Sequence, residues 1–256
     1  MTFTNLLNEF SSAINHCRAE LSSIDVVEED TFFYAILRIY SRVLLSCCEI
    51  FFLLKEKYPH GAMSLSRQVY EGLVIIDILQ KGEKDRDTNM PVRFFDAAKI
   101  RALQYYLCLA KLVIENNPSD VEAQKTKDGL EYQLDEYRNK YPNIKKFDEY
   151  WWIGCNTFNE LVCRSQYKKW HMYQLASMNI HLNAYSAMEY LNHCDGIIIG
   201  ELDEGGEIPL WYTSLCLGTI IIDIISEKYP SLCSGELKKE IEALMIDSSK
   251  FVKHQR

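Results

Sequence analysis

The chain has 256 residues, of which 48% are hydrophobic and 25% are charged, as in an ordinary globular protein with a sizeable core. It has only 11 glycines and 6 prolines, too few for the many turns of a β-sandwich or barrel. The net charge of −8 disfavours general binding to duplex nucleic acid, which requires a basic surface.

Cysteine usage and the first residues predict the compartment. The nine cysteines include no C-x-x-C pair, and Met1 leads directly into T-F-T-N-L-L-N-E-F without a signal-peptide pattern. We therefore expect a cytoplasmic protein whose cysteines serve as small core residues. Residues 32–54 carry three charged side chains and residues 215–225 are too few to cross a bilayer, so no membrane span is expected.

Nearly every segment has the hydrophobic period of an amphipathic helix, and none alternates as a strand does. Thr4 is expected to cap a first helix that ends near Leu21. Asp30 or Thr31 opens a long second helix, which ends before Pro59 because proline disfavours helical backbone at the residue preceding it.

The same period and the breaker residues predict the remaining helices. They cover residues 62–81, 91–117, 119–141, 157–163, 167–191, 210–229 and 234–245. The expected fold class is therefore all-α. We predict a single irregular domain of about eight or nine helices that spans residues 1–256.

The helix predicted over residues 167–191 carries a column of polar side chains. Tyr173, Ser177, His181 and Tyr185 follow at four-residue intervals, where a core helix would carry leucine or isoleucine. A serine hydroxyl and an imidazole one turn apart can hydrogen-bond each other or a shared ligand. The alternative, that these side chains only satisfy one another in a half-buried helix, stays open.

Arg67 and Glu71 lie one turn apart in the helix predicted over residues 62–81. Such a pair is commonly a surface ion pair worth a few tenths of a kcal/mol. Beside His181 the pair could instead orient the imidazole or bind a phosphate. Arg93 begins the next helix and is expected to face the same cavity.

Known catalytic sequence signatures are missing. The sequence contains no H-E-x-x-H zinc motif, phosphate-binding glycine loop, G-x-S-x-G elbow or dinucleotide fingerprint. We therefore expect no metal site and no cofactor.

Four motifs keep a characteristic order: R-Q-V-Y-E, R-F-F-D-A-A-K-I-R, W-I-G-C-N-T-F-N-E-L and Y-x-x-A-S-M-N-I-H-L-N. Over residues 64–190 this order resembles a bacterial all-helical family of unknown function with Arg…Glu, Trp-Gly and Ser-x-x-x-His motifs. The resemblance implies a shared polar pocket and assigns no reaction. It marks six residues: Arg67, Glu71, Arg93, Trp152, Ser177 and His181. The polar column adds Tyr173 to these candidates. The chain departs from the pattern at Ile153 and Leu182.

A second spacing resembles the higher-eukaryote and prokaryote nucleotide-binding (HEPN) superfamily. Arg164 and His171 are separated by six residues, as in the signature of its metal-independent ribonucleases, which act across a dimer interface. In that chemistry the arginine stabilises the phosphorane charge and the histidine moves the 2′-hydroxyl proton.

These features leave several functions open. The first is a binding or effector protein of bacterial stress or phage defence, with a nucleotide-like or RNA ligand in the pocket. Its enzymatic version is a metal-independent ribonuclease with His181 or His171 as general base. The others are a ligand sensor and an interaction module that docks a protein partner through exposed Tyr150, Trp151 and Trp152. A homodimer is compatible with each.

Overall fold

The structure is a computed structural model, and it describes residues 2–24, 31–168, 173 and 206–254. Every regular element within these ranges is helical, which confirms the all-α class. The chain divides into two compact units, Met1–Lys81 with Ser165–Arg256, and Gly82–Arg164. The single-domain organisation stays a prediction.

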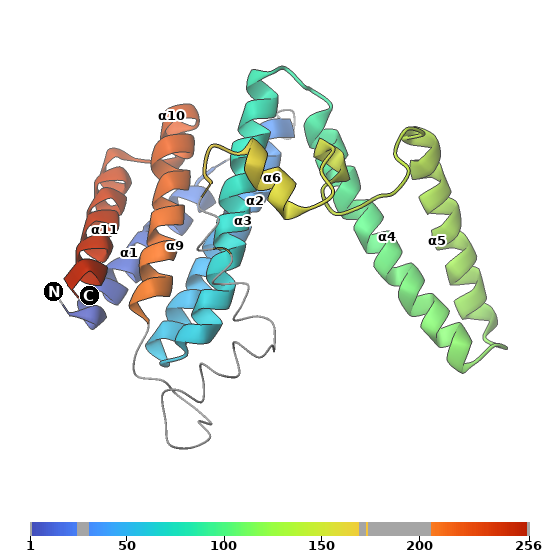
Figure 1. Cartoon of the computed structure of the whole chain (residues 1–256), viewed down its shortest axis with the longest axis horizontal. Coiled ribbons are helices and arrows are strands. Elements are labelled where there is room, and N and C mark those ends of the chain that lie inside the picture. Colours follow the sequence, from blue (N-terminus) through green and yellow to red (C-terminus); the bar gives the residue numbers. More distant parts are fainter. Residues whose placement is uncertain (1, 25–30, 169–172, 174–205, 255–256) are drawn as a thin grey trace. The chain divides into compact units, whose positions relative to one another are not determined.

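The first unit is a bundle of long helices (Figure 1). The helix α1 packs on α2 and α11, and α11 packs on α9. The elements are α1 Phe3–Ser22, α2 Thr31–Lys55, α3 Pro59–Lys84 (whose last turn enters the second unit), α9 Glu207–Thr219, a π-helical segment Ile220–Ile225, α10 Ser226–Lys228, a 3₁₀ turn Pro230–Leu232 and α11 Gly235–His254.

Helix boundaries differ from the predicted ones by a few residues. Thr2 caps α1 in place of Thr4, because its hydroxyl accepts a hydrogen bond from the backbone N–H of Asn5 at 3.2 Å. Pro59 begins α3, a position where its missing N–H has no cost. The same helix continues through Gly82, where the prediction ended it.

The core of the first unit combines apolar helix faces with buried tyrosines. Tyr40, Tyr70 and Tyr212 are among its largest fully buried side chains. Gly72 lets α3 approach α2 closely, because a Cβ there would lie 2.3 Å from the Cγ2 atom of Val43. The backbones of the two helices are therefore closer than a side chain at position 72 permits.

The helical stretch Glu207–Lys228 is long and apolar enough to cross a membrane by length and composition. It is longer than residues 215–225 because α9 continues through the π-helical segment into α10. Within the fold, 72% of its most apolar window is buried, as in the core helices of globular proteins.

The second unit is built on an antiparallel hairpin of α4, Met90–Asn116, and α5, Val121–Lys140 (Figure 1). Asp120 caps α5 in place of Ser119, since its carboxylate accepts from the N–H of Ala123 at 2.9 Å. A 3₁₀ turn, Trp151–Ile153, and the short helix α6, Phe158–Arg164, complete the unit.

The prediction of an exposed aromatic docking patch is wrong. Tyr150, Trp151 and Trp152 are buried, with exposed fractions of 8%, 6% and 3%. Trp151 packs edge-on against Phe147 and Trp152 against Phe94, with ring centroids 5.1 Å apart in both pairs. The apolar rings therefore form the small core of the second unit.

Candidate functional site

Arg67, Glu71 and Tyr173 form one contact cluster in the first unit, here called the Arg67 cluster. The Nε atom of Arg67 donates to the Oε1 atom of Glu71 at 2.8 Å, as the one-turn spacing on α3 predicts. The Tyr173 hydroxyl donates to the same carboxylate oxygen at 3.3 Å. The Arg67 guanidinium carbon lies 4.6 Å from the centroid of the Tyr173 ring, within cation–π range.

The Arg67 cluster lies between core and surface. The side chains of Arg67 and Glu71 are 27% and 25% exposed, whereas Tyr173 is buried. An ion pair at this depth is less screened than one in bulk solvent, yet it stays reachable from water. The pair is therefore partly buried, which is intermediate between a surface ion pair and a fully enclosed one.

Two further tyrosines support the cluster from inside. The Tyr70 ring lies 5.9 Å from the Tyr173 ring and 6.0 Å from the Tyr212 ring. The Tyr70 hydroxyl donates to the backbone carbonyl of Tyr167 at 2.8 Å. Burial raises the pKa of Tyr212 far above its ordinary value, so its hydroxyl stays protonated. A neutral aromatic stack thus fixes the plane of Tyr173 beside Arg67.

Asp77 forms a second polar group on α3, and it is 1% exposed. Its Oδ2 atom accepts from the Ser165 hydroxyl at 2.8 Å, the backbone N–H of Gln166 at 3.1 Å and the Lys81 ammonium at 3.0 Å. Its Oδ1 atom has no hydrogen-bond partner among the described residues. The sequence signal was an aspartate inside an apolar run, but nothing in it identified Ser165 as a partner.

Three residues that follow α6 in the sequence each contact one side of α3. Ser165 contacts Asp77, Tyr167 contacts Tyr70, and Tyr173 contacts the start of this side at Arg67 and Glu71. The α3 positions involved recur every three, four or seven residues, as on one helix face. Residues far apart in sequence thus make polar contacts along one side of α3.

Tyr167 also contacts the π-helical segment Ile220–Ile225. Its hydroxyl lies 3.4 Å from the Oδ2 atom of Asp223. Burial, and then the nearby Asp223 carboxylate, raise the pKa of Tyr167 to about 12. Single π turns in α-helices are rare and are frequent at functional sites.

Arg93 and Trp152, both predicted ligand contacts, lie in the second unit and bind each other. The Arg93 Nε atom donates to the Trp152 carbonyl at 2.9 Å, and its Nη2 atom donates to Asp87 at 2.6 Å. These contacts hold the 3₁₀ turn to the start of α4. The sequence predicted both residues but not their direct contact.

The remaining predicted residues divide into one that the structure places and three that it does not describe. Arg164 donates to the backbone carbonyls of Ile153 and Gly154, where Gly154 has a φ of +67°. Ser177, His181 and His171 lie outside the described residues. Within the described ranges, no group of three or more His, Cys, Asp or Glu side chains could hold a metal ion.

No curated protein and no solved structure matches the chain. A sequence family matches residues 33–198, which include both α3 and Tyr173. That range is more than half of the chain. The chain therefore belongs to this family, described as a family of unknown function (DUF5677).

Proposed function

We propose that the chain is a helical binding protein that takes a phosphate-bearing, nucleotide-like ligand at the Arg67 cluster. One observation carries this proposal. The Arg67 guanidinium is held in a fixed orientation by Glu71 on one side and the Tyr173 ring on the other, while about a quarter of its side chain remains exposed. A pre-oriented guanidinium loses little entropy when it binds an anion.

The neighbouring groups suit such a ligand. Arginine pairs with phosphate through its planar fork, which gives both affinity and orientation. The Glu71 carboxylate can accept hydrogen bonds from hydroxyl or amino groups of the same ligand. The net charge of −8 repels long polyanions and so favours a small ligand over duplex nucleic acid.

The polar column extends this proposal along the chain. Tyr173 is its first member, and Ser177 and His181 follow at four-residue intervals in sequence. If the predicted helix continues from Tyr173, both side chains lie on the face that meets α3. We propose them as further ligand contacts.

The biological setting proposed is that of a cytoplasmic effector in bacterial stress or phage defence. Buried, unpaired thiols such as Cys17 and Cys47 suit a reducing compartment. A binding protein in such a pathway would report the concentration of a small phosphorylated molecule.

Ligand-dependent thermal stabilisation tests the proposal. Purified full-length chain would be heated with inorganic phosphate, nucleoside mono-, di- and triphosphates, or a short single-stranded RNA, and hits would be titrated by calorimetry. We expect Arg67→Ala to abolish the rise in Tm that a ligand produces. Arg138→Ala is the matched control, because Arg138 forms an exposed helical ion pair with Asp135. A rise that survives in Arg67→Ala, or no rise with any probe, would refute the site.

A metal-independent ribonuclease remains the alternative proposal. It would use His181 with Ser177, or Arg164 with His171, on an RNA substrate. The contacts of Arg164 with two backbone carbonyls favour a structural role for that arginine, so we rank binding first.

A further inference from the structure

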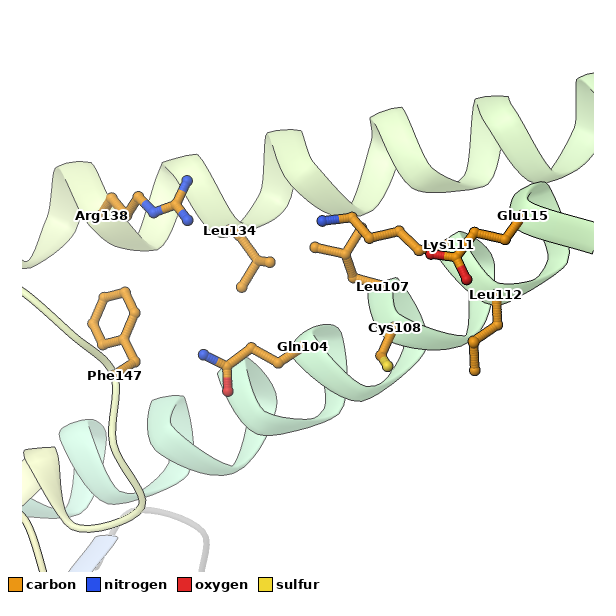
Figure 2. Close-up of a pocket in the computed structure, with 9 residues that line it drawn as sticks. All are labelled: Gln104, Leu107, Cys108, Lys111, Leu112, Glu115, Leu134, Arg138 and Phe147. Carbon is orange, nitrogen blue, oxygen red and sulfur yellow. The ribbon is translucent and has the colours of Figure 1, made fainter. Parts of the chain in front are cut away.

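The helix α4 is apolar on two opposite faces. One face packs on α5, where Leu107 and Leu134 border a cavity of about 430 Å³ between the helices. Figure 2 shows Leu107 and Leu134 between α4 and α5; Leu112 also lines this cavity, although its side chain points away from α5 in the picture. The face toward α5 consists of side chains at three- and four-residue spacing: Leu103, Leu107, Ala110 and Ile114.

The opposite face, here called the α4 stripe, consists of Ala98, Ala102, Tyr105, Leu109 and Leu112. These positions alternate in steps of four and three residues, the spacing of a coiled-coil seam. The three large side chains are 62%, 40% and 48% exposed. A helix in a simple hairpin needs only one apolar face, so a second one with seam spacing points to a second helix.

The two halves of the α4 stripe differ in size. A shallow cavity of about 500 Å³ lies over its first half and is bordered by Ala98, Ala102 and Tyr105. Its second half carries the branched side chains Leu109 and Leu112. A partner helix that fits this face must carry large side chains opposite the small ones of α4, and small side chains opposite the large ones.

We propose that the partner is a second copy of this chain, with the two α4 stripes packed antiparallel about a two-fold axis. Reversal of the helix places Leu112 of one copy over Ala102 of the other, and Leu109 over Tyr105. The small Ala102 then faces the large Leu112, and the pairing is the same from both copies. In a parallel pair the alanines would face each other and leave a void.

The flanking charges fit the same arrangement. Arg101, Cys108 and Glu115 follow at seven-residue spacing and so lie along one edge of the α4 stripe. Equivalent edges face each other in an antiparallel pair. Arg101 of each copy then lies beside Glu115 of the other, which gives two opposite-charge pairs about the axis. A parallel pair would bring neither charge opposite its complement.

Cys108 marks the centre of this edge. It lies seven residues from both Arg101 and Glu115, so the two Cys108 side chains meet near the two-fold axis. The thiol is exposed and not in a disulfide. The stripe spans residues 98–112, about 21 Å of helix, and so forms an interface at the low end of stable sizes. We therefore expect a reversible dimer.

Sedimentation equilibrium of the full chain over a wide concentration range is the first test. We expect a monomer–dimer equilibrium that Leu109→Glu shifts to monomer. Val121→Glu, at a 67%-exposed apolar residue outside the stripe, should leave the equilibrium unchanged. Arg101→Glu and Glu115→Arg should each weaken the dimer at least tenfold, and the double charge reversal should restore it. The proposal is overturned if the chain stays monomeric at every concentration. It is also overturned if neither Leu109→Glu nor the charge reversals change the monomer–dimer equilibrium.

Cross-linking supplies an independent geometric test. A short bis-maleimide should join two copies through Cys108, so Cys108→Ser should abolish the covalent dimer. Cys163→Ser is the matched control, since Cys163 is the other exposed cysteine of the described chain. Cross-linking that depends on Cys163, or that persists in Cys108→Ser, would refute the antiparallel register. Phosphate or nucleotide binding at Arg67 can fail without affecting either result.

Discussion

The guanidinium of Arg67 lies 4.6 Å from the ring centroid of Tyr173, a residue far from it in sequence. The contact joins the helix that carries the Arg…Glu motif to the start of the segment that carries the Ser-x-x-x-His motif. Two of the ordered motifs thus meet in space, and both lie within the family match at residues 33–198.

The first prediction separates the ring of Tyr173 from its hydroxyl. Tyr173→Phe keeps the cation–π contact and loses the long hydrogen bond of 3.3 Å to Glu71. Tyr173→Leu loses the ring and should weaken ligand binding about fivefold, or about 1 kcal/mol, while Tyr173→Phe should weaken it less than twofold. Calorimetric titration with the best nucleotide measures both. Equal losses in the two variants would show that the ring does not orient Arg67.

The second prediction concerns the buried carboxylate of Asp77. Asp77→Ala leaves the Ser165 hydroxyl and the Gln166 N–H without their acceptor in the interior, so we expect a loss of about 3 kcal/mol in the free energy of unfolding. Asp77→Asn keeps one acceptor oxygen and should cost about half as much. Urea denaturation measures both.

A matched control for Asp77 exists on the surface. Asp135 forms an ion pair with Arg138 in which both side chains are more than 60% exposed. Asp135→Ala should cost less than about 0.5 kcal/mol. Similar losses for the Asp77 and Asp135 variants would mean that Asp77 does not hold the Ser165 segment to α3.

Periodicity was sufficient for the fold class, because each long helix has one face that must be buried and the sequence records that face. The ends of α1 and α3 were less predictable. Thr2 and Thr4 are both competent caps, and Pro59 can either end or begin a helix. Only the hydrogen bonds of the folded chain decide between such neighbours.

The candidate site was predictable where its residues are local and not where they are distant. Arg67 and Glu71 lie one turn apart, so their pairing follows from helix geometry. The contact of Arg93 with Trp152 depends on how a non-helical segment folds back, which no periodicity encodes. The buried tryptophans were mistaken for an exposed patch because composition alone does not say which face a 3₁₀ turn presents.

A third prediction compares two glycines inside helices. Gly72→Ala places a methyl group 2.3 Å from the Cγ2 atom of Val43, a stiff β-branched side chain, so we expect a loss of about 1–3 kcal/mol. Gly129→Ala in α5 meets no atom within 4 Å and should gain up to about 1 kcal/mol in helix propensity. Chemical denaturation of both variants measures the difference. Adding Val43→Ala should restore part of the Gly72→Ala loss.

A fourth prediction follows from the pKa of Cys17, which burial raises to about 12 from an ordinary value near 9. Between these values the thiol stays protonated in the folded chain and ionises in the unfolded one. Rising pH therefore favours unfolding, by at most about 1.4 kcal/mol per pH unit for this group. Cys17→Ala should flatten the fall in stability above pH 9, measured by denaturation at a series of pH values.

The fifth prediction tests the ribonuclease alternative through Arg164. Its guanidinium donates to the carbonyls of Ile153 and Gly154 at the end of a 3₁₀ turn. Arg164→Ala should therefore cost about 1–2 kcal/mol of stability and leave any RNA cleavage unchanged. The assay incubates labelled RNA with the chain in chelator, beside His171→Ala and His181→Ala.

The pattern of loss among these three variants assigns the chemistry. If cleavage is lost in folded Arg164→Ala and His171→Ala but kept in His181→Ala, the Arg164–His171 pair is catalytic. The structural role assigned to Arg164 would then be wrong. Loss in His181→Ala alone would assign the reaction to the polar column that begins at Tyr173. Because a general base and a phosphate clamp act on the same substrate, Arg67→Ala should then lose cleavage as well. Absence of cleavage in every sample is the outcome we expect, since the proposed role of Arg67 is to bind a phosphate-bearing ligand.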